Sequence, residues 1–276
     1  MGATVARNAE HGEGRHPLAL WWRSRYGLRL LLEAGLVGGL LLTYLRVRQF
    51  TRGDLRAAFS NTREVIHFER WIGLPFEDDL QRALLNHTEV VRFLNHYYLW
   101  FHFPVAIGVL AWLYWRHNGH YFYIRRLMAV VTFVSLVIHV AYPLAPPRMM
   151  PGFVDTMFRY GPSIYTRNTF EGAANQIAAM PSLHFGWAVI AAMAVVHVNR
   201  SRWRYVAVLH PFLMGTAIVA TANHWWVDAA VAGLIIFCCW AVAKGVSRVL
   251  AAREQRWEEG AYTSLSSRTS STNVRC

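Results

Sequence analysis

Long runs of apolar residues alternate with short, Arg-bearing polar segments along most of the chain. Several runs reach about 18 residues, the length at which an α-helix begins to cross the hydrocarbon core of a bilayer. The pattern predicts an all-α integral membrane protein with six transmembrane helices, and both termini on one side. The expected ranges of the six helices are 28–45, 93–115, 125–144, 182–198, 203–222 and 224–244.

Residues 46–92, between the first two predicted spans, show a different pattern. Leu55, Phe59, Val65, Ile66 and Phe68 recur at roughly helical spacing, and charged residues, mostly Arg, fill the other positions. Such helices lie in the membrane interface with their apolar face toward the lipid. We therefore predict interfacial amphipathic helices between spans one and two, with a plain solvated connection as the alternative.

The two ends of the chain differ from its middle. Residues 1–26 form a polar segment that we place in the cytoplasm, and no small-residue cleavage site follows the first apolar run, which predicts an uncleaved helix. The six-helix domain is expected over 27–250, and 251–276 read as a polar, disordered tail. The long connection 143–180 has no helical period, which is typical of a functional loop.

Composition and charge narrow the class of protein. Hydrophobic residues make up 54% of the chain and charged residues 16%, well below the charged fraction of a soluble domain. The net charge of +12 comes from residues scattered between apolar runs, which favours anionic lipid headgroups over nucleic acid as partners. The cysteines, Cys238, Cys239 and Cys276, indicate neither a disulfide framework nor a metal site.

The distribution of cations predicts the orientation, because cytoplasmic connections carry an excess of Lys and Arg. Cations gather at the amino terminus, after spans two and four, and beyond span six: Arg15, Arg23, Arg25, Arg116, Arg125, Arg126, Arg200, Arg202, Arg204, Lys244, Arg248 and Arg253. Both termini are then cytoplasmic. The connections after spans three and five face the extracytoplasmic side of the cell membrane.

Three polar constellations fall on that outer side, at 142–148, 180–184 and 223–228. Ionisable residues at such depths are costly and by default functional. His224 and Asp228 stand four residues apart on a presumed helix, so the carboxylate can fix the imidazole tautomer and leave the other nitrogen free to attack. Ser182 and His184 open a helix, where backbone N–H groups bind anions such as phosphate.

Plainer explanations exist for single residues. A membrane histidine is more often a hydrogen-bonding partner between helices, which we expect for His96, His102, His139, His197 and His210. Arg148 could mark only the bilayer interface. The convergence of all three constellations on one face of the membrane favours a catalytic site.

The motifs resemble those of the type 2 phosphatidic-acid phosphatase superfamily, which shares its site with vanadium haloperoxidases. Pro181-Ser182-Leu183-His184 is similar to the family's Pro-Ser-Gly-His, and the third motif's His and Asp match His224 and Asp228. The Leu variant, Ala-Pro-Pro-Arg and His-Trp-Trp-Val-Asp look more like the branch with fungal inositol phosphorylceramide synthases (inositolphosphotransferases) and many bacterial membrane proteins. The resemblance covers roughly residues 28–244.

The chain departs from the family pattern at its phosphate-binding cations. Ala141 stands at the Lys of the first motif, and Ala217 and Ile218 replace the Ser-Arg that precedes the nucleophile. Only Arg148 of the first motif is matched. We expect Arg159 or Arg167 in the long loop, or Asn223, to complete the phosphate clamp.

The resemblance implies a metal-independent lipid phosphatase or phosphotransferase that needs no cofactor. His224 would form a phosphohistidine, Asp228 would orient it, and His184 would protonate the leaving oxygen. Substrate contacts are expected from Arg148, Ser182, Asn223, Arg167 and Tyr165. The substrate would be a lipid phosphate or phospholipid, and the second acceptor water or a polyol, sugar or lipid alcohol.

Two other classes compete with this hypothesis. Four histidines, His96, His102, His139 and His210, could pair across helices around a haem or quinone. A transporter is the other alternative, but the sequence shows no inverted repeat with broken helices.

Overall fold

The computed structural model describes residues 25–50, 54–161 and 177–272. Over these ranges the chain is helical apart from turns, loops and one isolated parallel β-bridge between Leu144 and Ala178, and it contains no strand. The predicted all-α class is therefore confirmed. The chain divides into two compact units, residues 1–47 and 48–276, and helix α2 (Arg25–Phe50) supplies the described part of the first.

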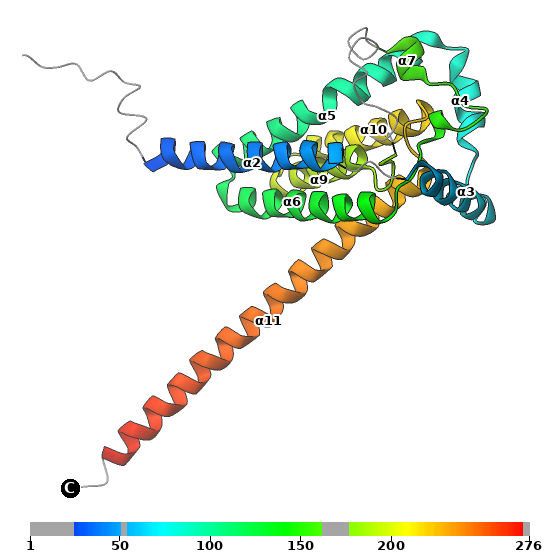
Figure 1. Ribbon diagram of the computed structural model, residues 1–276. Helices are drawn as coiled ribbons and strands as arrows, with labels where there is room; N and C mark the ends of the chain where they lie inside the picture. Colours follow the sequence, from blue (N-terminus) through cyan, green and yellow to red (C-terminus); the bar gives the residue numbers. More distant parts are fainter. Residues whose placement is uncertain (1–24, 51–53, 162–176, 273–276) are drawn as a thin grey trace, which may run out of the picture. The chain divides into compact units, whose positions relative to one another are not determined.

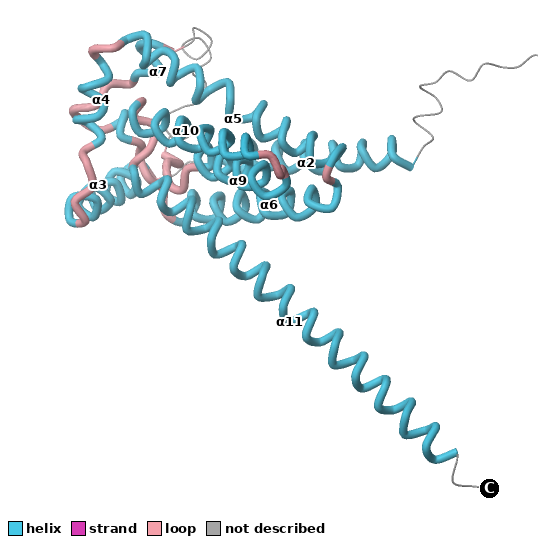
Figure 2. The backbone as a smooth tube through the Cα atoms, turned by 180° about the vertical axis from the view of Figure 1, so that it is seen from behind, coloured by secondary structure: helices cyan, strands magenta, loops and turns pink. Residues whose placement is uncertain are grey.

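The second unit is a bundle of long helices that lie side by side (Figures 1 and 2). It contains α5 (Thr88–Arg116), α6 (Asn118–Ala141), α9 (Leu183–Val198), α10 (Leu209–Ala220) and the first turns of α11 (Trp226–Thr272), which then extends away from the bundle. Helix α9 lies among the others and contacts all four. This central position explains why its sequence is apolar on every face.

Among the residues that the structure describes, four helical segments are long and apolar enough to cross a membrane. They are Thr88–Arg116, Asn118–Ala141, Trp226–Val249 and Arg202–Ala220, the last joining the 3₁₀ helix η3 (Arg202–Val208) to α10. Of the other two predicted spans, the first lies within α2, which contains the apolar stretch Leu30–Gly39, and the fourth coincides with the shorter apolar helix Leu183–Val198. The apolar helices agree with a membrane protein, and the count of six spans stays a prediction.

Helix α9 is shorter than a full span. At about 1.5 Å per residue its 16 residues extend about 24 Å, less than the roughly 30 Å of a hydrocarbon core. Ser182 caps the start of the helix, and its side chain accepts a hydrogen bond from the Phe185 amide. Its contact with α10 is close, because a Cβ added at Gly215 would lie 3.3 Å from the Phe185 ring.

Two amphipathic helices, α3 (Leu55–Trp71) and α4 (Glu77–Leu85), follow α2. The predicted apolar face of α3 includes exposed Leu55 and Phe68 together with buried Val65. The buried positions are Ala58, Thr62, Val65 and Glu69, and two of them are polar. This face packs on the segment after α6 and on the start of α11, which supply backbone partners for its polar side chains.

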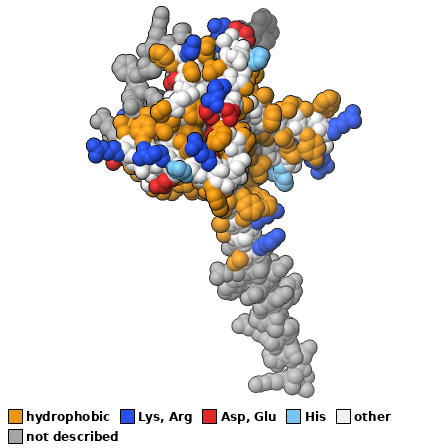
Figure 3. Space-filling model, turned by 90° about the vertical axis from the view of Figure 1, so that its right-hand side faces the viewer, with side chains coloured by type: hydrophobic (Ala, Val, Ile, Leu, Met, Phe, Trp, Pro, Cys, Tyr) orange, Lys and Arg blue, Asp and Glu red, His pale blue; other side chains and the backbone are white. Residues whose placement is uncertain are grey.

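The face of the molecule in Figure 3 carries charged side chains of both signs among exposed hydrophobic ones. Exposed apolar residues of α3 and the following turn include Phe68, Trp71, Ile72 and Phe76. Their exposure is what an interfacial location would require, and that location stays a prediction.

The long connection after α6 contains short helices, η1 (Pro147–Met149) and α7 (Thr156–Tyr160). Side-chain amides fix it to neighbouring helices. Gln81 donates to the carbonyl of Val154 and accepts its amide, and Asn95 donates to the carbonyl of Thr156. At the other end of the chain, α11 is helical to Thr272, and the disordered tail from residue 251 stays a prediction.

Candidate active site

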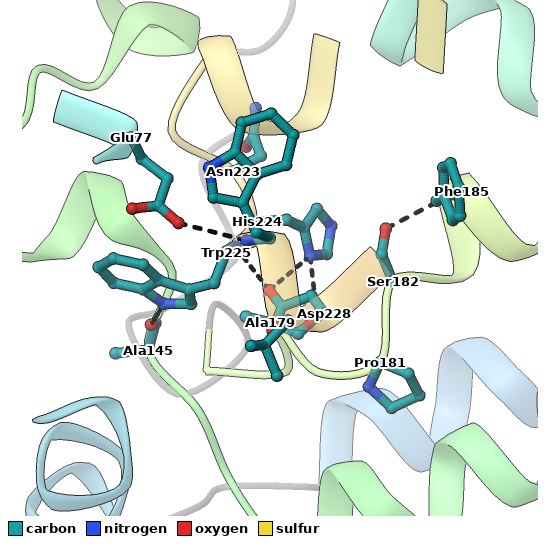
Figure 4. A network of polar contacts seen from close by, with 12 residues as sticks. Glu77, Ala145, Ala179, Pro181, Ser182, Phe185, Asn223, His224, Trp225 and Asp228 are labelled. Atoms are coloured by element: carbon teal, nitrogen blue, oxygen red, sulfur yellow. Dashed lines mark hydrogen bonds and ion pairs between the residues drawn. The ribbon is translucent and has the colours of Figure 1, made fainter. Parts of the chain in front are cut away.

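Backbone hydrogen bonds join the three polar constellations pairwise. The amide of Ala179 donates to the carbonyl of Leu144 (3.2 Å), which aligns the first constellation with the residues that lead into the second. The backbone amide of Arg148 donates to the carbonyl oxygen of Ala222 (2.9 Å). The backbone amide of Ser182 donates to the backbone carbonyl oxygen of Asp228 (3.1 Å). Segments far apart in the sequence therefore meet where α6 and α10 end and where α9 and α11 begin (Figure 4).

A tight turn at the end of α10 presents His224. The amides of Asn223 and His224 both donate to the carbonyl of Ile218, at 2.9 and 3.0 Å. Ala222 has a φ of 57°, in the left-handed region that usually favours glycine at helix ends. Strained backbone of this kind clusters at functional sites, and here it turns the chain sharply before α11 begins.

The His224 ring has a single tautomer that satisfies its contacts. Its Nδ1 lies 2.8 Å from the carbonyl oxygen of Ala179 and 3.1 Å from Oδ2 of Asp228 (Figure 4). A carbonyl oxygen only accepts hydrogen bonds, so Nδ1 must carry the hydrogen. The other nitrogen, Nε2, then holds a lone pair and can act as a nucleophile.

Asp228 is fully buried and organises the start of α11. Besides facing His224, its Oδ2 accepts the amide of Trp225 at 2.9 Å. Trp225 is itself buried, and its indole nitrogen donates to the Ala145 carbonyl at 2.9 Å. The carboxylate thus lies in a fixed position where it stabilises positive charge on the imidazole.

His184 is the second residue of α9, and its ring centroid lies 6.2 Å from that of His224. Two side chains of α5 hold this ring in place: Tyr98 stacks on it at 4.1 Å, and His102 lies against it at 4.2 Å. His102 in turn stacks on Trp187 at 5.0 Å.

Arg148 is nearly buried and contacts the turn that leads to His224. Its Nη1 donates a short hydrogen bond to Oδ1 of Asn223. The side-chain amide of Asn223 in turn donates to the Thr221 hydroxyl at 2.6 Å. Its Nε lies 3.9 Å from Oδ2 of Asp155, and no described residue accepts a hydrogen bond from it. A buried guanidinium N–H without an acceptor is costly, and an oxygen of a bound anion would satisfy it.

The remaining predicted substrate contacts have different outcomes. Ser182 is fully buried and caps α9, so its oxygen already accepts the Phe185 amide at 3.4 Å. Tyr165 and Arg167 lie outside the described residues. Arg159 is exposed, and its guanidinium lies over the Tyr160 ring.

The positions that depart from the family pattern hold no substitute cation. Ala217 and Ile218 are fully buried in the apolar core between α5, α9 and α10. A guanidinium at residue 218 would have to replace core packing. Among the described residues, Arg148 is a cation that contacts the turn before His224, through its bonds to Ala222 and Asn223.

Two buried acids of this site, Glu69 and Glu77, were not identified from the sequence. Glu69 accepts the Val227 amide at 2.8 Å, and Glu77 accepts the Trp226 amide at 3.3 Å. Burial, with the hydrogen bond and negative charge of Glu77, raises the pKa of Glu69 to about 9. Their partners lie some 150 residues away along the chain, so periodicity within α3 and α4 gives no signal of the contact.

The other histidines have packing contacts. His139 Nε2 lies 3.1 Å from the carbonyl of Pro181, His210 Nδ1 lies 2.6 Å from the Tyr97 hydroxyl, and His96 bonds the backbone of its own helix. Within the described ranges no group of three or more His, Cys, Asp or Glu residues has an arrangement that would hold a metal ion.

The long apolar helices and the buried pair His224 and Asp228 define a class, helical membrane proteins with a candidate catalytic histidine. Comparison with known families then identifies the family. Residues 63–243 match the model of the PAP2 superfamily, and the chain belongs to it. Members are typically phosphatases, so membership indicates a phosphatase-type activity on lipid phosphates. No curated protein matches significantly, and no solved structure does. The narrower likeness to inositol phosphorylceramide synthases stays a prediction.

Proposed function

We propose that this chain is a membrane-embedded lipid phosphatase or phosphotransferase that works through a phosphohistidine on His224. The observation that carries the proposal is the double acceptor at Nδ1 of His224, Ala179 and Asp228, because it leaves the Nε2 lone pair available. A histidine held in this way by a buried carboxylate has the features of an activated nucleophile.

In the first half-reaction Nε2 of His224 attacks the phosphorus in line, and the bond from phosphorus to the lipid oxygen breaks. His184, in its protonated form, donates a proton to that oxygen, so the leaving group departs as a neutral alcohol. Asp228 stabilises the positive charge that develops on the His224 ring. A positioned general acid of this kind contributes about 10²–10⁴ in rate.

In the second half-reaction the neutral His184 removes a proton from the acceptor. The acceptor oxygen attacks the phosphorus, the bond to Nε2 breaks, and His224 returns to its starting tautomer. Water as acceptor gives a phosphatase, and a polyol, sugar or lipid hydroxyl gives a phosphotransferase. The buried N–H of Arg148 and the amides at the start of α9 would stabilise charge on the phosphoryl oxygens.

The decisive experiment measures phosphate release from a panel of lipid phosphates and phospholipids, with and without candidate alcohols. Purified protein in detergent is also quenched in acid-free denaturant after exposure to labelled substrate, to retain a phosphohistidine. We expect labelled protein from the wild type and none from His224→Ala. The matched control is His96→Ala, because His96 is an exposed histidine that bonds only to its own helix among the contacts described.

Activity of His224→Ala at the wild-type rate would contradict the proposal. We also expect full activity in EDTA, because side chains supply both the nucleophile and the acid. A haem or quinone protein would instead show a cofactor absorption band and no phosphate release.

A further inference from the structure

The start of α11 carries a second polar feature that the proposed mechanism does not use. The first N–H groups of an α-helix have no partner within the helix. Here three successive amides each donate to a carboxyl oxygen. The Trp225 amide donates to Asp228, the Trp226 amide to Glu77, and the Val227 amide to Glu69. Two helices from the segment after α2 therefore hold the residues that follow directly after His224.

Both carboxyl groups are buried, with exposed fractions of 4% for Glu69 and 5% for Glu77. No described Arg, Lys or His forms an ion pair with either one. Two unpaired carboxylates side by side in a buried place would be strongly unfavourable. The adjacent Trp226 and Val227 amides bring the two groups together, and a hydrogen bond with Glu77 is among the causes that raise the pKa of Glu69. A bond between two carboxyl groups requires a proton on one of them.

Taking the proposed function as given, we infer that Glu69 and Glu77 form a carboxyl pair that shares one proton and positions the nucleophile His224. The protonated member, Glu69, donates to Glu77 and accepts the Val227 amide. Glu77 remains the charged member and accepts the Trp226 amide. The pair touches neither substrate nor the reacting atoms, so its two members are positioning residues.

The charges around the pair favour retention of the proton. From α11, Asp228 faces Glu69 and adds negative charge, and its own hydrogen-bond partner is His224. From α4 the facing group is Glu77. Arg70, the next residue of α3, is exposed, and its guanidinium lies over the Phe76 ring. Consistent with this setting, the pKa of Glu69 is raised to about 9.

The pair predicts how stability depends on pH. In the unfolded chain Glu69 ionises near its ordinary pKa of 4.5, whereas in the folded protein it stays protonated up to about pH 9. Its contribution to stability is therefore complete below pH 4.5 and is lost as the pH rises toward 9. Above pH 9 both states are ionised, and the loss levels off.

The variant Glu69→Gln tests the inference without removing the contacts. Its amide group donates permanently to Glu77, and its carbonyl still accepts the Val227 amide. We expect kcat and KM at pH 7 within about twofold of wild type, because the amide imitates the protonated acid. Above pH 9 the wild type should lose about a further tenfold in kcat/KM per pH unit relative to Glu69→Gln.

Two measurements need no substrate. The infrared carbonyl band of a protonated carboxyl group should be present in wild type at pH 7 and absent in Glu69→Gln. In Glu77→Gln, which removes the facing negative charge, the band should titrate at lower pH. The melting temperature of wild type should fall from pH 5 to 9 relative to that of Glu69→Gln.

The matched control is Glu89→Gln, an exposed acid on α5 paired with Arg92, which should reproduce every wild-type profile. An unchanged infrared band and the same alkaline slope in Glu69→Gln would overturn the inference. If no lipid phosphate is turned over, the proposed function fails, and the infrared and melting measurements still decide whether the pair holds a proton.

Discussion

At the scale of single residues, each side chain of the candidate site is fixed by another. The His224 ring faces two acceptors, Asp228 also binds the Trp225 amide, and His184 lies between the rings of Tyr98 and His102. Function in such a group is not additive, because removing one member changes the geometry or the charge seen by the next.

The exchange Asp228→Asn separates charge from geometry. The amide oxygen of Asn can still accept the Trp225 amide and the His224 Nδ1–H, so the fold should be kept. The lost negative charge no longer stabilises the cationic ring, and we expect kcat to fall by about 10³–10⁴. The measurement is single-turnover phosphorylation of His224, with circular dichroism to check folding. An unchanged rate would remove Asp228 from the mechanism.

The exchange His184→Ala tests the acid through the leaving group. A lipid alkoxide leaves poorly without a proton, so we expect a loss of about 10²–10⁴ on a lipid phosphate. An activated aryl phosphate needs no such proton and should lose much less. Equal losses on the two substrates would indicate instead that His184 binds the phosphate group.

Residue spacing predicted part of this arrangement. The four-residue separation of His224 and Asp228 indicated a contact across one helical turn, and the hydrogen bond is present. The second acceptor, Ala179, lies 45 residues earlier in the chain and has no side-chain signal. Contacts made by backbone carbonyls depend on the tertiary path of the chain, which periodicity does not reveal.

At the scale of elements, α3 holds the segment that carries Arg148. The Thr62 hydroxyl accepts the Ala145 amide at 3.0 Å and lies 3.1 Å from the Ala145 carbonyl, while Asn61 donates to Pro143 at 2.8 Å. Hydrophobic periodicity predicted a helix here with an apolar face toward lipid, and it gave no signal that Thr62 and Glu69 are buried. Polar residues become buried where a neighbouring backbone supplies partners.

The exchange Thr62→Val keeps the shape of the side chain and removes its hydroxyl. The Ala145 amide then stays buried without an acceptor, which costs about 1–3 kcal/mol. We expect a lower melting temperature in detergent and a smaller kcat, because the loop before Arg148 loosens. Thr216→Val is the control, since the Thr216 hydroxyl bonds only to its own helix among the contacts described. Equal melting temperatures for the two variants would contradict this role.

At the scale of the whole molecule, the orientation in the membrane decides which leaflet supplies the substrate. The Arg distribution predicts that the connection after α6 is extracytoplasmic and that Ser201 is cytoplasmic. A cysteine at Gly161 would report on the first, but a Cβ there would lie 2.2 Å from the Met157 carbonyl oxygen. Pro151, exposed in the turn after η1, is a better position.

We therefore expect Pro151→Cys to react with an impermeant maleimide on intact cells and Ser201→Cys to be protected. Both variants are made in a background that lacks Cys238, Cys239 and Cys276. The opposite labelling would place the candidate site on the cytoplasmic side. Labelling of both positions, or of neither, would contradict the count of six spans.

The replacement of the family's Ser-Arg by buried Ala217 and Ile218 has a consequence for the end of the catalytic cycle. Each missing cation weakens the hold on a released phosphate ion, whose residence time in the site should be short. We expect product inhibition to be weak, with an inhibition constant for inorganic phosphate of about 1 mM or higher, near −4 kcal/mol of binding free energy. Tight inhibition at micromolar phosphate would mean that cations beyond Arg148 reach the site.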